Sequence, residues 1–259
     1  MAQRGQSFQQ ILTHYYPGTS VTAETERGRR GDTEARRRGD TEARRFGDTG
    51  TRRRGETEYF PASPRRHVSA SHFTLTYPQS IDQREAEQVL NLLEATRSEL
   101  LSRVSAAGVQ PAFPNLEIVF NETTGDFVGR TGMPSWTAAA TKNKRVELQP
   151  LTLLKQRGIL ETTLRHELVH ALIDALGSTQ TPRWLTEGMA IYVAGEGKMM
   201  AQRPPTSVAA VEHALATAKS AADMQTAYAG AYNLVRRLIQ SEGEQNVWKR
   251  IANRSWKIL

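Results

Sequence analysis

The sequence of 259 residues contains no cysteine. Disulfide bonds and thiolate metal ligands are therefore excluded, and any bound metal must be held by His, Asp or Glu. Long apolar runs are also missing, because stretches such as residues 151–154 and 168–173 are far shorter than the ~20 residues of a transmembrane helix. Aromatic residues make up only 7%, but 38% of the residues are hydrophobic, which is enough for a modest globular core.

The N-terminus also lacks the apolar run and small-residue cleavage site of a secretory signal, so taken alone it predicts a cytoplasmic protein. The chain carries a net charge of +7, and the charge is unevenly spread. Residues 1–54 contain 12 Lys or Arg against 7 Asp or Glu, so most of the net positive charge lies in this segment.

An eight-residue repeat occupies the end of that segment, residues 31–54, and continues beyond it, with units that begin at positions 31, 39, 47 and 55 and open with Gly-Asp-Thr or Gly-Glu-Thr. It offers almost nothing to bury, so residues 23–65 are predicted to be a disordered linker. Its Arg clusters are candidates for contact with peptidoglycan or an anionic cell-wall polymer. Each unit also carries acids that offset the basic charge, which argues against nucleic acid as a partner.

From residue 66 onward the composition is that of an ordinary domain. Alternating and β-branched apolar residues predict strands, and apolar residues at helical spacing predict helices. Because the strands come first and the helices follow, the sequence predicts an α+β domain over residues 66–259. The expected elements are a strand at 71–77, a helix at 85–104, a strand at 116–120, an irregular glycine-rich segment at 125–134, a hairpin of strands 136–141 and 145–149, and helices from 151 onward.

A His-Glu-x-x-His motif supplies the candidate catalytic residues. His166 and His170 are four residues apart, so on a helix both imidazoles project from one face and can bind one ion. Glu167 lies between them and is offset around the helix, where it can accept a proton from metal-bound water instead of binding the metal. Surface histidines on a helix are the alternative interpretation.

A second predicted helix, residues 183–192, carries Glu187, seventeen residues after His170. A helical hairpin would bring this carboxylate to the two histidines. Two His and one Glu with an open fourth position form the ligand set of a catalytic zinc, whereas a structural zinc has four protein ligands. The sequence therefore predicts one Zn²⁺ per chain, bound by His166, His170 and Glu187.

These motifs resemble the peptidase MA-like gluzincins, a family of zinc metallopeptidases, over about residues 70–255. The resemblance implies a thermolysin-like catalytic domain, a small N-terminal mixed sheet followed by the active-site helices, with Glu167 as general base. It also implies that the strand at 136–141 is an edge along which an extended substrate peptide lies. Ile191 stands where thermolysin carries an Asp, four residues after the Glu ligand, so the group that orients a ligand histidine must come from elsewhere.

Gluzincins often use a Tyr or His from a later helix to stabilise the oxyanion. Tyr228 and Tyr232 are the two candidates here, one turn apart, and we select Tyr228; packing in the core is the alternative for either. Asp174, on the face of His170, is a candidate to orient that ligand, with a solvated acid as the alternative. We assign Trp184 to core packing.

The other resemblance lies at the N-terminus, where residues 1–20 are similar to the closing segment of the stage II sporulation protein D family, which acts on peptidoglycan. We assign residues 1–22 to this segment. About twenty residues cannot fold as that domain. We expect a remnant of an upstream domain in a longer fusion whose signal peptide is missing, and hence an exported or cell-envelope protein. A short amphipathic helix is the alternative.

The sequence as a whole predicts a zinc metallopeptidase that hydrolyses peptide bonds in a peptide or protein substrate, with cell-wall and envelope peptides as candidates. Zinc would lower the pKa of its bound water and Glu167 would take the proton. Two alternatives remain open at this point: a catalytically weak peptidoglycan-associated module, and a polyanion-binding module that works through the basic linker.

Overall fold

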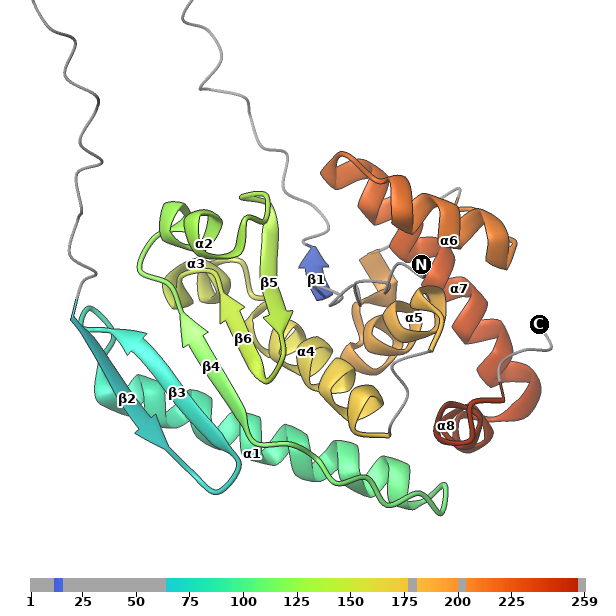
Figure 1. Ribbon diagram of the computed structural model, residues 1–259, viewed down its shortest axis with the longest axis horizontal. Coiled ribbons are helices and arrows are strands. Elements are labelled where there is room, and N and C mark those ends of the chain that lie inside the picture. The colour runs from blue at the N-terminus through green and yellow to red at the C-terminus, as the bar shows by residue number, and fades with distance from the viewer. Residues whose placement is uncertain (1–11, 16–63, 177–180, 200–203, 256–259) are drawn as a thin grey trace, which may run out of the picture. The chain divides into compact units, whose positions relative to one another are not determined.

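The computed structural model describes residues 12–15, 64–176, 181–199 and 204–255. Within these residues a mixed β-sheet packs against α-helices, so the predicted α+β class is confirmed (Figure 1). The strands are β1 (Leu12–Tyr15), β2 (Arg65–Ser69), β3 (Phe73–Pro78), β4 (Leu116–Phe120), β5 (Thr137–Lys142) and β6 (Arg145–Leu148). The helices are α1 (Gln83–Ser105), α2 (Thr124–Thr131), α3 (Leu151–Gln156), α4 (Leu160–Ala175), α5 (Arg183–Ala194), the 3-10 helix η1 (Glu196–Met199), α6 (Val208–Thr217), α7 (Ala221–Glu242) and α8 (Glu244–Ala252).

The sheet is built from five strands of residues 65–148, to which β1 is added at one edge. Its order is β1-β5-β6-β4-β3-β2. The neighbours β3–β4 and β4–β6 are parallel, and the remaining pairs are antiparallel. The β5–β6 hairpin turns at Asn143, whose φ of 58° is the left-handed conformation that such tight turns require.

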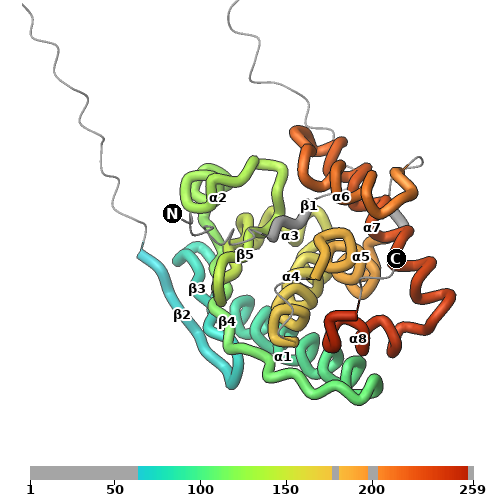
Figure 2. The backbone as a smooth tube through the Cα atoms, turned by 45° about the vertical axis from the view of Figure 1, so that its right-hand side comes forward, coloured from blue at the N-terminus to red at the C-terminus, as the bar shows by residue number. Residues whose placement is uncertain are grey.

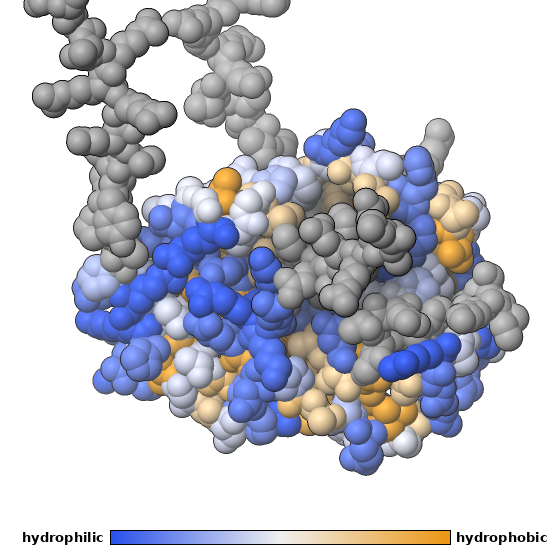
Figure 3. Space-filling model, viewed as in Figure 1, coloured by the Kyte–Doolittle hydropathy of each residue, from blue (hydrophilic) through white to orange (hydrophobic). Residues whose placement is uncertain are grey.

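The two faces of the sheet differ in chemistry. One face carries buried side chains such as Leu75, Ile118 and Leu148 and packs against the helices. On the other face, Arg145 bridges Glu117 and Glu147 at 2.8 to 2.9 Å, and the surface over β2, β4 and β6 is mainly hydrophilic (Figure 3). The apolar face therefore fixes on which side α1 and α4 cover the sheet.

Helix α4 occupies the centre of the helical layer, between α1 and the sheet on one side and α5 on the other (Figure 2). It is buried around most of its circumference, which is why its polar residues lie in the interior. Helices α5 and α7 pack unusually closely at Gly188, where an added Cβ would lie 2.5 Å from the Ala231 carbonyl oxygen. Glycine is therefore required there for α5 to reach its position.

Several predicted elements are confirmed: the strand at 116–120, the long helix, the 136–149 hairpin and the helical C-terminal part. The prediction of an irregular segment at 125–134 was wrong. Residues Thr124–Thr131 form α2, because Thr123 and Asp126 make a reciprocal capping box, Phe127 is buried and Gly132 ends the helix at a φ of 69°.

The strand at 136–141, predicted as an edge along which a substrate peptide lies, is paired with β1 in the structure, and substrate binding there stays a prediction. Strand β2 begins at Arg65, one residue before the predicted start of the domain, and lies at the opposite edge of the sheet. Residues 16–63, which hold nearly all of the predicted linker, lie outside the described residues, and the assignments of 1–22 and 23–65 stay predictions. No helix in the described part of the chain is long and apolar enough to cross a membrane.

Candidate metal centre

Helix α4 places the two predicted histidine ligands side by side. His166 and His170 are one turn apart, both are fully buried, and their ring centroids are 4.8 Å apart. Leucines on the remaining faces of α4 pack into the core. The helix is thus held by apolar contacts while its imidazoles face inward.

Helix α5 brings the third predicted ligand to the same point. Glu187 Oε2 lies 3.6 Å from His166 Nε2 and 3.6 Å from His170 Nε2. Ligand atoms held about 2.0–2.1 Å from a tetrahedral zinc are separated by about 3.3 Å. The three donor atoms therefore approach the separation of a zinc ligand set. Glu187 follows His170 by 17 residues and His166 by 21, and the packing of α5 against α4 brings the three side chains together.

The unsatisfied polar atoms of these side chains fit a cation. Both carboxylate oxygens of Glu187 and both ring nitrogens of His170 make no hydrogen bond among the described residues, although both side chains are fully buried. A buried carboxylate without such partners is costly unless a positive charge offsets it. His166, His170 and Glu187 can each offer one ligand atom, all within 4.8 Å of one another, and this nitrogen and oxygen donor set suits zinc.

The charges of the cluster are strongly coupled without a metal. Burial alone would raise the pKa of Glu187, but His170, His166 and Arg183 hold it well below its usual range. Burial alone would lower the pKa of His166, but Glu196 and Glu187 raise it to about 10. A metal that binds here must therefore displace a proton from His166.

Glu167 lies beside the three candidate ligands, and a strand of the sheet holds it. Its Oε2 accepts a hydrogen bond of 2.5 Å from the hydroxyl of Thr141 on β5, and both side chains are buried. Its Oε1 makes no hydrogen bond among the described residues. Burial raises the pKa of Glu167. Because Thr141 anchors Oε2, Oε1 is the oxygen that is left to accept a proton.

Glu196 is a residue of the site that the sequence analysis missed. It begins η1, directly after the left-handed Gly195 that ends α5, and its buried Oε1 lies 3.4 Å from His166 Nδ1. It thus stands where a group that orients a ligand histidine is needed. No motif spacing pointed to it; the only signal was an acidic residue after a helix-ending glycine.

Asp174, the residue predicted to orient a ligand histidine, makes no hydrogen bond to one in the described structure. It is exposed, although His170 is near enough to affect its pKa. Ile191 is part of the buried core. Arg183, also missed, lies 3.6 Å from Glu187 Oε1 one turn earlier on α5.

The two candidate tyrosines have different surroundings. The Tyr228 ring is buried, with its centroid 6.3 Å from that of His166. The Tyr232 ring packs against Tyr192, with centroids 6.4 Å apart, and against Gly197. Of the two, the structure brings Tyr228 to a candidate ligand, His166. Trp184 is buried in the core, as predicted.

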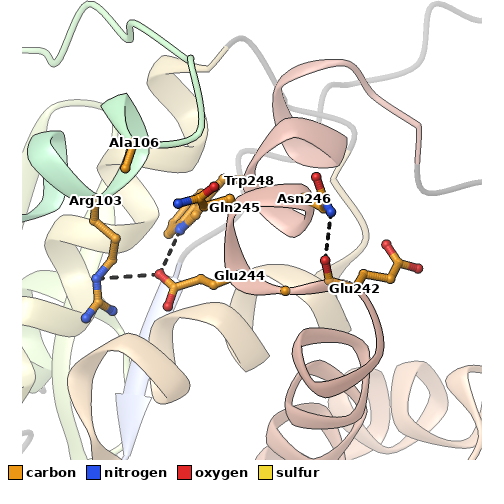
Figure 4. Close-up of a pocket in the computed structure, with 8 residues that line it drawn as sticks. Arg103, Ala106, Glu242, Glu244, Gln245, Asn246 and Trp248 are labelled. Carbon is orange, nitrogen blue, oxygen red and sulfur yellow. Dashed lines mark hydrogen bonds and ion pairs between the residues drawn. The ribbon is translucent and has the colours of Figure 1, made fainter.

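A hollow of about 470 Å³ lies away from this cluster, between the end of α1 and the α7–α8 junction (Figure 4). Its charged groups satisfy one another: Glu244 accepts a 3.0 Å hydrogen bond from the Trp248 indole and lies 3.5 Å from Arg103. Asn246 donates to the Glu242 carbonyl at 2.7 Å. These contacts join helices to one another.

No protein-family model matches the chain, and a search of characterised proteins finds no significant relative. The gluzincin and sporulation-protein resemblances therefore stay predictions, and the function has to be argued from the site.

Proposed function

We propose that the protein is a zinc-dependent metallopeptidase with a thermolysin-like arrangement of its site. The observation that carries the proposal is the buried His166, His170 and Glu187 cluster with a separately anchored carboxylate, Glu167, beside it. A structural metal site needs no such free carboxylate, whereas peptide hydrolysis needs a base next to the metal.

Zinc, when bound by His166, His170 and Glu187, would supply a Lewis acid that polarises a carbonyl and makes water more acidic. The residues of the chain carry out the proton transfers. Glu167 accepts at Oε1 a proton from the water that attacks the scissile carbonyl, while Thr141 holds Oε2 in place. The same carboxyl group then delivers the proton to the leaving amine as the C–N bond breaks. Tyr228, beside His166, is our candidate donor to the developing oxyanion.

Zinc content and peptide hydrolysis, measured on three proteins, test the proposal. Wild type is expected to hold about one zinc per chain, as in other catalytic sites of this ligand type, and to cleave members of a peptide library that includes cell-wall cross-links. Glu187→Ala should lose most of the metal, while Glu167→Gln should keep the metal and lose hydrolysis. Zinc binding without any cleavage by wild type would instead support a catalytically weak binding module, and absence of zinc would refute the metal centre.

A further inference from the structure

Strand β5, whose Thr141 holds Glu167, is paired with a distant part of the chain. Strand β1 lies antiparallel to β5, with Leu12 opposite Thr141 and His14 opposite Ala139 (Figure 1). More than 120 residues separate the two strands in the sequence. The pairing is therefore a tertiary contact of the N-terminal segment.

The pairing of β5 with β6, on the side away from β1, shows which backbone N–H and C=O groups of β5 point toward β1. The Gln149 N–H donates to the Ala138 carbonyl, so Ala138 faces β6. Backbone groups alternate along an antiparallel strand. The N–H and C=O groups of Ala139 and Thr141 therefore face β1, where Leu12 and His14 stand opposite them.

Strand β1 also lies against the helices of the metal centre. It contacts α4, which carries the His-Glu-x-x-His motif, and α7, which carries Tyr228. Thr141, opposite Leu12, is the residue whose hydroxyl holds Glu167. Because neighbouring strands are about 4.8 Å apart, the β1 backbone runs where a peptide added to β5 would pass the general base.

We propose that residues Leu12–Tyr15 occupy the peptide-binding edge of β5 as a built-in competitor, so that a substrate peptide binds only after β1 leaves. The identity of the displacing ligand rests on the proposed function, whereas the pairing itself does not. Strand addition satisfies the backbone of any extended peptide, so one edge can accept both segments in turn. Covalent attachment favours β1, because its binding is intramolecular.

Two proline variants of the full chain separate this pairing from a general effect of proline. His14→Pro removes an N–H that faces β5, whereas the N–H removed by Thr13→Pro faces away. Loss of one backbone hydrogen bond between the strands should lower the equilibrium constant for pairing of β1 with β5 by about tenfold. We expect faster amide exchange at Ala139 and Thr141 and a lower KM for cleaved peptides in His14→Pro, with little change in Thr13→Pro.

A peptide of residues 9–18, added to His14→Pro, should restore protection of the two amides and inhibit cleavage. Unchanged exchange at Ala139 and Thr141 in His14→Pro, or equal changes in both variants, would overturn the proposal even if the protein is an active peptidase. Faster exchange in His14→Pro alone, without cleavage by any zinc-loaded protein, would instead sustain β1 pairing and refute the peptidase function.

Discussion

Thr141 provides a direct test of how Glu167, the proposed general base, is held. Its hydroxyl donates to Glu167 Oε2 at 2.5 Å in a buried environment. Burial raises the pKa of Glu167, and the Thr141 hydrogen bond opposes that rise by stabilising the charged carboxylate. Thr141→Val removes the hydroxyl at nearly constant size, so the pKa of Glu167 should rise further.

The size of the effect follows from the type of hydrogen bond. A hydrogen bond to a charged group contributes about 1.5–3 kcal/mol, and about 1.4 kcal/mol corresponds to one pKa unit. Glu167 must be ionised to accept a proton, so activity is lost as the pH falls through its pKa. The acid limb of the kcat/KM profile should therefore shift to higher pH by about one to two units. At a pH below this limb, kcat/KM of the variant should be about 10- to 100-fold lower than that of wild type.

The same strand offers a matched control. Thr137 is also a buried threonine of β5, but its hydroxyl makes no hydrogen bond among the described residues. Thr137→Val should leave the pH profile unchanged. The assay is kcat/KM of zinc-loaded proteins as a function of pH, with zinc content measured alongside. An unmoved acid limb in Thr141→Val, or equal shifts in both variants, would refute the reasoning.

Three further predictions concern the scaffold and the ligands. Gly188→Ala should destabilise the protein by about 2 kcal/mol, because its Cβ would meet α7 backbone, while Gly129→Ala, in open space on α2, should stabilise it by about 0.5–1 kcal/mol; thermal denaturation compares them. Glu196→Gln should weaken zinc binding by about 10- to 100-fold, and Asp174→Asn should not, as competition with a chelator will show. Metal-free protein should lose stability as the pH rises from 6.5 to about 10, because His166 holds its proton more tightly when folded; a melting temperature that stays constant over this range would contradict that assignment.

The parts of the fold that follow local rules were predictable from the sequence. The β5–β6 hairpin and strand β4 have clear periodicity, and the spacing of His166 and His170 places both on one helix face. Helix α2 was missed because its glycines were weighted above the capping box formed by Thr123 and Asp126. The capping box is visible in the sequence, and it stabilises a helix despite the two glycines that α2 contains.

The features that were missed depend on contacts between distant segments. Strand β2 has little apolar alternation, because an edge strand needs only its backbone to join a sheet. Nothing local pairs Leu12 with Thr141, and nothing in the spacing of Glu196 links it to His166. Such relations arise from packing, which a single sequence does not display.

The two edges of the sheet also differ in how they avoid association with other chains. The β2 edge carries exposed Arg66 and His67, and charges of this kind discourage a foreign strand from pairing. The β5 edge carries only small, buried residues over Ala138–Ala140, so β1 is its protection. If substrate displaces β1, the interval before the edge is covered again is also the interval in which the protein is most prone to aggregate, and rapid re-docking of β1 would serve solubility as much as regulation.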